Sequence, residues 1–325
     1  MTTPLISVHG LKKHFPVRGS GLLRRDLLRA VDGVDFTVDA GETFGIVGES
    51  GCGKSTTGRL IVNLLKPTDG SIRVRGVDVN RVDAKGMRQI RRELQIVFQD
   101  PFGSLNPRMR VGAAIEEPLR CHRPELGRAD RDALVGDLME RVGLNEADRR
   151  KYPHEFSGGQ RQRICIARAL SAGPSVIVCD EAVSALDVSI QAQILNLLQD
   201  LQDERNLTIL FISHDLGVVK HISDRVCVMY AGRIVELCGR EEIFTSSLHP
   251  YTQALLSAIP IPEPGRRNPA AVLKGDPPSA VGPRKGCAFA SRCPRRMDVC
   301  EEVDPALQEP LPGHAVACHL YPSHV

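Results

Sequence analysis

The chain has 325 residues, of which 42% are hydrophobic and 25% are charged, and these proportions exclude a disordered or collagen-like protein. Lys and Arg number 42 against 39 Asp and Glu, so the net charge of +3 gives no global reason to expect nucleic acid as the main partner. Trp is absent and aromatic residues make up only 4%, which disfavours a stacking surface for single-stranded nucleic acid.

The sequence contains no apolar run of the roughly 20 residues needed to cross a bilayer. Met1–Phe15 also lacks the apolar stretch of a signal peptide, so we expect a cytosolic chain. In a reducing compartment, disulfides are a poor explanation for the ten cysteines. Six of them are scattered singly, and four gather near the C-terminus.

Short apolar runs rich in Val, Ile and Phe alternate with helical patterns up to about Cys238. Apolar residues from Ile190 to Leu201 recur at the spacing of one stripe of an amphipathic helix. Strands that alternate with helices predict an α/β core with a largely parallel sheet. Buried strands are predicted at Phe44–Val47, Ile96–Phe98, Val176–Cys179, Thr208–Ile212 and Val226–Tyr230.

Two segments depart from this alternation. Residues from about Ala113 to Lys151 are polar and helix-prone, which predicts a helical insertion that ends near Tyr152 and Pro153. After Pro250 the chain becomes rich in Pro and Gly, which predicts an extended linker leading to the gathered cysteines.

A glycine-rich loop follows the first predicted strand. Gly48–Ser55 matches G-x-x-x-x-G-K-[ST] and precedes a helical pattern through Leu65, which is the context that this motif requires. Backbone N–H groups and the helix N-terminus suit a phosphate, while Lys54 can reach the β- and γ-phosphates and Ser55 can bind Mg²⁺. Motif and context together disfavour a loop that merely connects strand to helix. The loop predicts nucleotide binding without separating kinases, GTPases, motors and transporters.

The predicted strand Val176–Cys179 ends in two carboxylates. A buried parallel strand delivers Asp180 to the sheet edge beside the phosphate loop, where it can hold the Mg²⁺ shell. Glu181 can polarise a water for in-line attack on the γ-phosphate. A strand that simply ends in solvated acids is the alternative, and the phosphate loop upstream favours the catalytic interpretation.

The segment Phe156–Gln160 opens a further helical run. Ser157 and Gln160 form a capping-box pattern, so a well-capped helix is one explanation. Two glycines in the first turn weaken that helix, and capping alone gives no reason for both. Backbone amides at a helix N-terminus suit a second phosphate contact.

Together these motifs resemble the ATP-binding subunit of an ATP-binding-cassette (ABC) transporter. Phe156–Gln160 is similar to the family signature, which usually begins with Leu, and Ser184–Asp187 matches the family's D-loop. Ala182 stands where the family usually has Pro. The resemblance covers about Leu5 to Ala258, with the motifs in the family's order.

The resemblance also assigns three single residues. Gln99 matches the Q-loop, His214 the switch histidine, and Phe15 the aromatic that stacks on adenine. Taken singly, these residues also suit a surface amide, a core histidine and a core phenylalanine. Their place in the ordered set of motifs favours the functional interpretation.

The resemblance implies a P-loop NTPase core of the ABC ATPase type, with a helical subdomain and a Pro/Cys-rich C-terminal extension. It implies two such domains facing head to tail with two ATP molecules at the seam. The expected catalytic residues are Glu181, His214 and Lys54. The signature residues that act on the ATP of the other protomer are Ser157, Gly158, Gly159 and Gln160, and Asp187 is the D-loop residue. ATP and Mg²⁺ contacts are expected from Phe15, Gly48, Ser50, Gly51, Cys52, Gly53, Lys54, Ser55, Thr56, Gln99 and Asp180.

The segment Asp100–Arg108 and the helical insertion correspond to the region where the family docks its membrane subunits, although an ordinary turn also explains Phe102–Arg108. Three segments of the sequence are similar to the dipeptide/oligopeptide importer branch of the family: Asp100–Arg108, Asp187–Gln193 and His249–Thr252. The implied role is an ATPase that powers peptide uptake from the cytoplasmic face of the membrane. The implied partners are a second ABC subunit (a paralogue or a copy), two transmembrane permease subunits and, indirectly, a peptide-binding protein.

The gathered cysteines have the spacing C-x₅-C-x₆-C-x₁₇-C in a Pro-rich segment with little core of its own. A metal would explain how this segment folds, and chance clustering is the alternative. Wide gaps and Pro294 suit an iron–sulfur cluster better than a zinc ribbon. Some members of the peptide-importer branch carry a C-terminal [4Fe–4S] site with the pattern seen at Cys287–Pro294, and His314 and His319 are further candidates. The expected metal ligands are Cys287, Cys293, Cys300 and Cys318.

We expect residues 1–258 to form the ABC ATP-binding domain, with its helical insertion at about 113–172, and residues 259–325 to form the linker and the Cys-rich extension. A soluble ABC ATPase of DNA repair or cluster assembly is the alternative function, and a scaffold without turnover is a third. The single cassette and near-neutral charge disfavour the soluble ATPase. Intact Lys54, Glu181 and His214 disfavour the scaffold.

Overall fold

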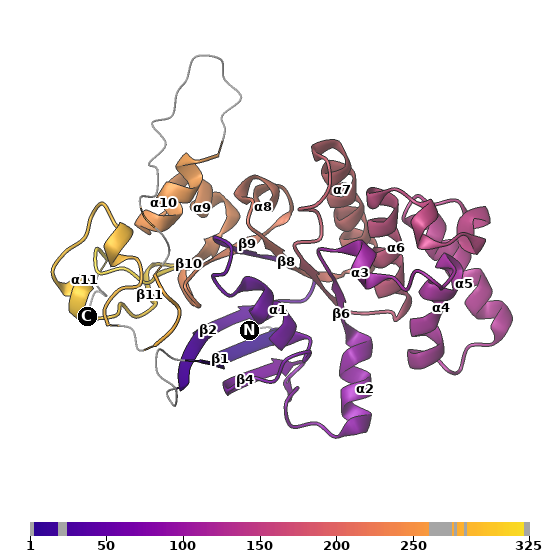
Figure 1. Ribbon diagram of the computed structural model, residues 1–325, viewed down its shortest axis with the longest axis horizontal. Coiled ribbons are helices and arrows are strands. Elements are labelled where there is room, and N and C mark those ends of the chain that lie inside the picture. Colours follow the sequence, from indigo (N-terminus) through magenta and orange to yellow (C-terminus); the bar gives the residue numbers. More distant parts are fainter. Residues whose placement is uncertain (1–2, 19–24, 260–274, 276–277, 283–284, 322–325) are drawn as a thin grey trace, which may run out of the picture. The chain divides into compact units, whose positions relative to one another are not determined.

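The structure is a computed structural model that describes residues 3–18, 25–259, 275, 278–282 and 285–321 (Figure 1). Most of the predicted Pro-rich linker lies outside these residues. The chain separates into two compact units. The first unit comprises Met1–Leu5, Asp39–Glu42 and Val74–Ile212, and the second comprises Ile6–Val38, Thr43–Arg73 and Ser213–Val325.

Parallel strands form the centre of the first unit. Their order is β8-β7-β6. Every residue of β7 is buried, and its Val and Ile side chains lie on both faces of the strand, as is typical of parallel sheets that helices cover on both sides. The predicted apolar stripe is confirmed on α7 (Val188–Arg205), where it buries Ile194, Leu198 and Leu201. The three strands are β6 (Leu94–Val97), β7 (Val176–Asp180) and β8 (Thr208–Ser213).

Helices make up most of the remaining first unit. α4 and α5 pack against α6, in the stretch where the sequence predicts a helical insertion. The strand and helices of this part are β5 (Val77–Asp78), α2 (Ala84–Glu93), α3 (Pro101–Ser104), α4 (Val111–His122), α5 (Arg128–Arg141), η1 (Glu146–Arg150), η2 (Pro153–Glu155) and α6 (Gly158–Ser171).

The second unit contains a long antiparallel pair, β1 (Ile6–Arg18) and β2 (Arg25–Val38), beside β4 (Asp69–Val74). The apolar residues on one face of this pair are buried, including Val8 and Val34. The sequence pattern does not reveal these strands. They add an antiparallel sheet to the predicted α/β architecture.

A second sheet in this unit has the order β11-β12-β10-β9-β3. Only β3 and β9 are parallel within it, so the parallel arrangement predicted for the five strands is confirmed there and in β6–β8. The sequence did not predict β10, β11 and β12, which pair antiparallel. The strands are β3 (Thr43–Val47), β9 (Arg225–Tyr230), β10 (Arg233–Gly239), β11 (Gln308–Leu311) and β12 (His314–Val316). The helices are α1 (Lys54–Ile61), α8 (Leu216–Ile222), α9 (Arg240–Ser246), α10 (Pro250–Ser257), η3 (Ala290–Arg292) and α11 (Val299–Glu302).

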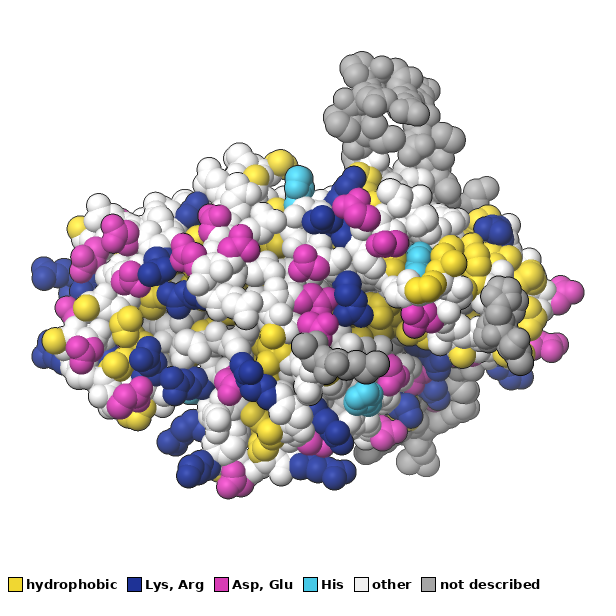
Figure 2. All heavy atoms as spheres, turned by 180° about the vertical axis from the view of Figure 1, so that it is seen from behind, with side chains coloured by type: hydrophobic (Ala, Val, Ile, Leu, Met, Phe, Trp, Pro, Cys, Tyr) yellow, Lys and Arg dark blue, Asp and Glu magenta, His cyan; other side chains and the backbone are white. Residues whose placement is uncertain are grey.

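The described helices include none with the length and apolarity that crossing a bilayer requires. On the face shown in Figure 2, basic and acidic side chains are interspersed, and apolar side chains gather at the C-terminal extension. Among the described residues of that extension, the exposed large apolar side chains are Val281, Val299, Val303, Leu307 and Leu311.

Candidate nucleotide site

The predicted phosphate loop connects β3 to α1 in the second unit. Two of its glycines are required by the backbone. Gly53 has φ 108°, and a Cβ at this position would lie 2.2 Å from the carbonyl oxygen of Ala30. Gly48 has φ 148°, and a Cβ there would lie 2.2 Å from the carbonyl oxygen of Met229. Only glycine adopts these conformations in such close contact with other backbone. The loop is therefore packed tightly against its own unit.

Lys54 lies at the start of α1, with 3% of its surface exposed. Its Nζ donates hydrogen bonds to the carbonyl oxygens of Gly48 (2.8 Å) and Glu49 (3.0 Å). The ammonium thus lies over the loop, as a group that binds β- and γ-phosphates must. Ser55 and Thr56 are half-buried in the first turn of α1.

Cys52 of the loop is buried as well, and burial raises the pKa of its thiol. Gly51, in contrast, is exposed, with φ 79° and no heavy atom within 4 Å of a Cβ built there. The loop therefore presents backbone rather than a bulky side chain at this position, which suits close approach of a phosphate.

Two further predicted nucleotide contacts lie in the second unit. His214 is exposed at the end of β8, directly before Asp215, whose carboxylate caps α8. A core histidine is therefore not the explanation for it. Phe15, on β1, is half-buried, and the Lys13 ammonium lies 5.0 Å from its ring centroid. Phe15 is likewise no fully buried core residue.

The acidic pair ends β7 in the first unit. Asp180 is 3% exposed, and Glu181 follows it with φ 52°, in the left-handed region that few residues other than glycine adopt. The Glu181 N–H donates to the Ile212 carbonyl (3.0 Å), and its own carbonyl accepts from Ser184 Oγ (3.0 Å). Backbone strain of this kind is held in place by surrounding hydrogen bonds and is concentrated at functional sites.

Gln99 and Asp187 occupy connecting positions in the same unit. Gln99 is exposed between β6 and α3, and Asp187 is exposed directly before α7. Both side chains are accessible to a ligand. The exposed position of Gln99 also agrees with the alternative of a surface amide.

The predicted signature begins α6 in the expected manner. The Ser157 hydroxyl accepts from the Gln160 N–H (3.3 Å), and Gln160 Oε1 accepts from the Ser157 N–H (3.0 Å), so the capping box is confirmed. A Cβ on Gly159 would lie 2.5 Å from Ile190 Cγ2, whereas one on Gly158 would have its nearest neighbour at 3.7 Å. Close packing against α7 therefore explains Gly159, and only Gly158 lacks a packing reason.

The segment after Gln99 is tied to the signature helix. The Arg161 guanidinium lies 3.7 Å from the ring centroid of Phe102, which is itself 64% exposed. Arg168 donates to the carbonyl oxygen of Ser104. Sequence spacing did not reveal these contacts, which link α3 to α6.

The predicted iron–sulfur site is not supported by the structure. Burial is the largest cause that raises the pKa of Cys287 to about 11, and it also raises the pKa values of Cys293 and Cys318. The described residues contain no group of three or more His, Cys, Asp or Glu that could hold a metal ion.

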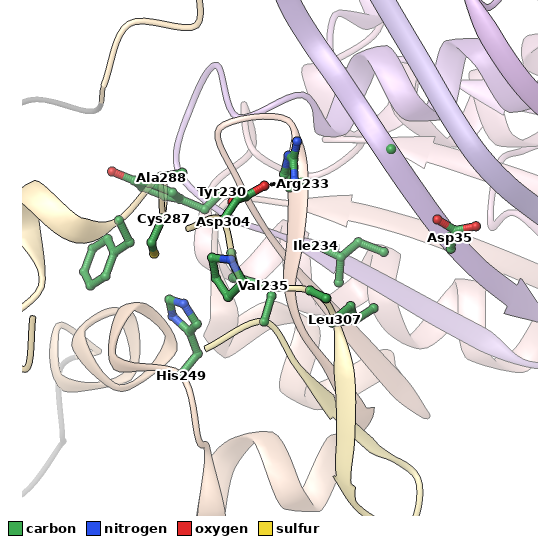
Figure 3. A pocket seen from close by; sticks show the side chains of 15 residues that line it. Asp35, Tyr230, Arg233, Ile234, Val235, His249, Cys287, Ala288, Asp304 and Leu307 are labelled. Atoms are coloured by element: carbon green, nitrogen blue, oxygen red, sulfur yellow. Dashed lines mark hydrogen bonds and ion pairs between the residues drawn. The ribbon is translucent and has the colours of Figure 1, made fainter. Parts of the chain in front are cut away.

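The extension containing these cysteines packs through other contacts. β12 pairs with β10, and His314 Nε2 lies 2.7 Å from Glu236 Oε1 in a fully buried pair. His319 is bonded to the Val303 carbonyl instead. Figure 3 shows Tyr230, His249 and other side chains around an adjoining cavity of about 410 Å³.

Comparison with known proteins shows the family. Residues 31–184 match a family model described as ABC transporter, and residues 235–300 match the oligopeptide/dipeptide transporter C-terminal region. The oligopeptide transport ATP-binding protein AppF of Bacillus subtilis is 52% identical over 322 residues, which are 98% of this chain and 97% of that protein. This chain belongs to the ABC transporter ATP-binding family. The putative oligopeptide transport ATP-binding protein YkfD of Bacillus subtilis is 51% identical, with 98% and 96% covered.

Solved structures agree with this assignment. The protein cbiO1 of Clostridium perfringens, part of the ABC transporter complex cbiONQ, has a TM-score of 0.64 and 28% identity, with 75% of this chain and 91% of that chain covered. A dimeric ATP-binding cassette bound to ADP and phosphate after hydrolysis has a TM-score of 0.64 and 27% identity, with 72% and 98% covered. The chain is thus an ABC-type ATPase, and the soluble DNA-repair alternative is not supported.

Proposed function

We propose that this chain is the ATP-hydrolysing subunit of an importer of dipeptides or oligopeptides. Its place is the cytoplasmic face of the membrane, with a second ATP-binding subunit, two transmembrane permease subunits and, indirectly, a peptide-binding protein. The observation that carries this proposal is the full-length similarity to an oligopeptide transport ATP-binding protein, joined to the match of residues 235–300. The proposal divides the chain into an ATP-binding domain, 1–258, and an extension, 259–325.

The chemistry follows from the side chains at hand. Lys54 neutralises charge on the β- and γ-phosphates, and Glu181 orients the attacking water. His214 contacts the γ-phosphate. The hydroxyl of Ser55 and the carboxylate of Asp180 are oxygen donors of the kind that Mg²⁺ prefers, and that ion supplies charge stabilisation on the phosphate oxygens.

Each nucleotide is completed by a second subunit in this proposal. The signature Ser157–Gln160 presents the N-terminus of α6 to the γ-phosphate held by the partner. Gly158 suits this role because its surroundings leave room beside it. ATP therefore joins the subunits, and its hydrolysis releases them.

Phe102 is the proposed contact to the membrane subunits. A large apolar side chain that is 64% exposed suits a protein interface. Because Arg161 stacks on it from α6, movement of the signature helix reaches this surface directly. The proposal includes ATP and Mg²⁺, and it leaves out the iron–sulfur cluster because no group of described residues supports one.

The test uses the assembled transporter in proteoliposomes. Glu181→Gln should retain ATP binding and stall the closed dimer, while hydrolysis and dipeptide uptake both collapse. Glu204→Gln removes an exposed carboxylate, 55% accessible, from the same unit and should change neither. Undiminished turnover in Glu181→Gln would refute its assigned role. Peptide uptake that does not depend on this chain would refute the proposed substrate class.

A further inference from the structure

An arginine of the C-terminal extension is paired with the phosphate loop. The Arg292 side chain, at the end of η3, is 5% exposed. Its Nη1 donates to Glu49 Oε2 at 2.7 Å and its Nη2 donates to Glu49 Oε1 at 2.9 Å. Both prongs of the guanidinium are thus engaged by one carboxylate, which is the strongest geometry for such a pair. Glu49 is the second residue of the loop Gly48–Ser55.

Glu49 is held at its backbone as well. Its N–H donates to the hydroxyl of Tyr251 at 2.8 Å, and Tyr251 is completely buried on α10. Its carbonyl oxygen accepts from Lys54 Nζ at 3.0 Å. Side chain, N–H and carbonyl each have a partner, so the conformation of this loop residue depends on Arg292, Tyr251 and Lys54 together.

Arg292 is itself anchored by an aromatic cluster. Its Nη1 lies 3.3 Å from the hydroxyl of Tyr230. Phe289, three residues earlier, packs at 5.4 Å between ring centroids against both Tyr230 and Tyr251. The position of the guanidinium is therefore fixed by packing, and the extension contacts the same tyrosine that holds the Glu49 N–H.

The charges explain why this pair matters for nucleotide. A carboxylate in a loop that grips a triphosphate opposes binding, because like charges repel. We propose that Arg292 is a positioning residue for the phosphate loop: it cancels the charge of Glu49 and fixes its conformation, so that tight ATP binding requires the docked C-terminal extension. This inference rests on the proposed assignment of Gly48–Ser55 as the ATP site.

The test measures MgATP affinity of the full-length chain by calorimetry, and KM and kcat of the assembled transporter. Arg292→Met removes the charge and keeps the length of the side chain. It should weaken MgATP binding roughly tenfold, equivalent to about 1.4 kcal/mol, while kcat at saturating ATP stays within about twofold of the parent. The double variant Arg292→Met with Glu49→Gln should recover most of the affinity, because no uncompensated carboxylate is left.

Two controls separate this role from general support of the fold. Arg296→Met removes an exposed ion pair with Glu301 from the same extension and should leave affinity unchanged. Lys54→Ala should abolish MgATP binding. If Lys54→Ala binds normally, the proposed ATP site itself is wrong. If Lys54→Ala fails to bind while Arg292→Met binds like the parent, only the present inference fails.

Rescue decides between charge cancellation and mere packing. If Arg292→Met loses affinity and Glu49→Gln does not restore it, Arg292 only supports the fold and the inference is overturned. Should Arg292→Met not fold, Arg292→Lys becomes the deciding variant, because it keeps the charge and only one prong. A loss of about threefold in its MgATP affinity would support the inference, and an unchanged affinity would overturn it.

Discussion

Protonation of His249 is expected to destabilise the protein below about pH 6.5. The side chain is 1% exposed, and burial lowers its pKa from 6.5 to about 4, because the imidazolium form loses its hydration. Between these pH values the unfolded chain binds a proton that the folded chain does not. The stability contributed by the neutral ring is therefore fully present above pH 6.5 and is lost as the pH falls toward 4.

The size of this loss follows from the two pKa values. A folded-state pKa of about 4 corresponds to a maximal loss of about 3 kcal/mol, of which about 2 kcal/mol is already lost at pH 5. Since whole domains are stable by only about 5–15 kcal/mol, one buried histidine should have a measurable effect.

The variant His249→Asn tests this effect, because it removes the titrating ring and leaves the parent as the comparison. His249 Nδ1 accepts the Tyr251 N–H at the start of α10 (3.0 Å), and Asn keeps an acceptor at this capping position without titrating. Urea unfolding of the full-length chain at pH 7.5, 6 and 5 should show the parent losing about 2 kcal/mol more than the variant between pH 7.5 and 5. His221→Asn, on the exposed surface of α8, should leave the parent's pH dependence unaltered. Parallel pH curves for the parent and His249→Asn would show this reasoning to be wrong.

Two other expectations follow from local contacts. Gly159→Ala should destabilise the protein by about 1–3 kcal/mol, because the added Cβ would overlap with Ile190. Gly158→Ala should destabilise it much less, so equal shifts of the two variants in thermal unfolding would contradict the packing argument. Maleimide at pH 7.5 should label Cys121 first, because Cys121 is exposed, whereas burial raises the pKa values of Cys179 and Cys227. The fast phase of labelling should therefore disappear in Cys121→Ser, and its retention would contradict this expectation.

The buried parallel strands could be predicted from the sequence, and the antiparallel pair could not. β7 and β8 are covered on both faces, so their Val and Ile runs are continuous and their positions were predicted to within a residue. β1 and β2 carry polar residues and several register shifts, which interrupt the alternating pattern by which a half-buried strand is recognised. Their pairing depends on contacts that no local pattern contains.

In the candidate site too, features encoded in one contiguous segment could be predicted, and features that depend on distant contacts could not. The phosphate loop is contiguous, so its spacing alone predicted Lys54 and Ser55. The need for Gly159 depends on Ile190, which belongs to another helix, and capping rules could not supply it. The cysteine spacing predicted metal ligands because spacing does not say how the four side chains are arranged in the fold, and the described residues contain no group of three or more His, Cys, Asp or Glu that could hold a metal ion.

Glu49 shows most clearly what a motif leaves unspecified. The pattern G-x-x-x-x-G-K-[ST] fixes the residues that hold phosphate and allows any residue at the intervening positions. An acid at such a position needs a compensating cation, and that cation can come from any element that packs beside the loop. In this chain it is Arg292, 243 positions away, whose side chain is 5% exposed. An acidic residue in a phosphate loop is therefore a reason to look for a partner cation elsewhere in the fold.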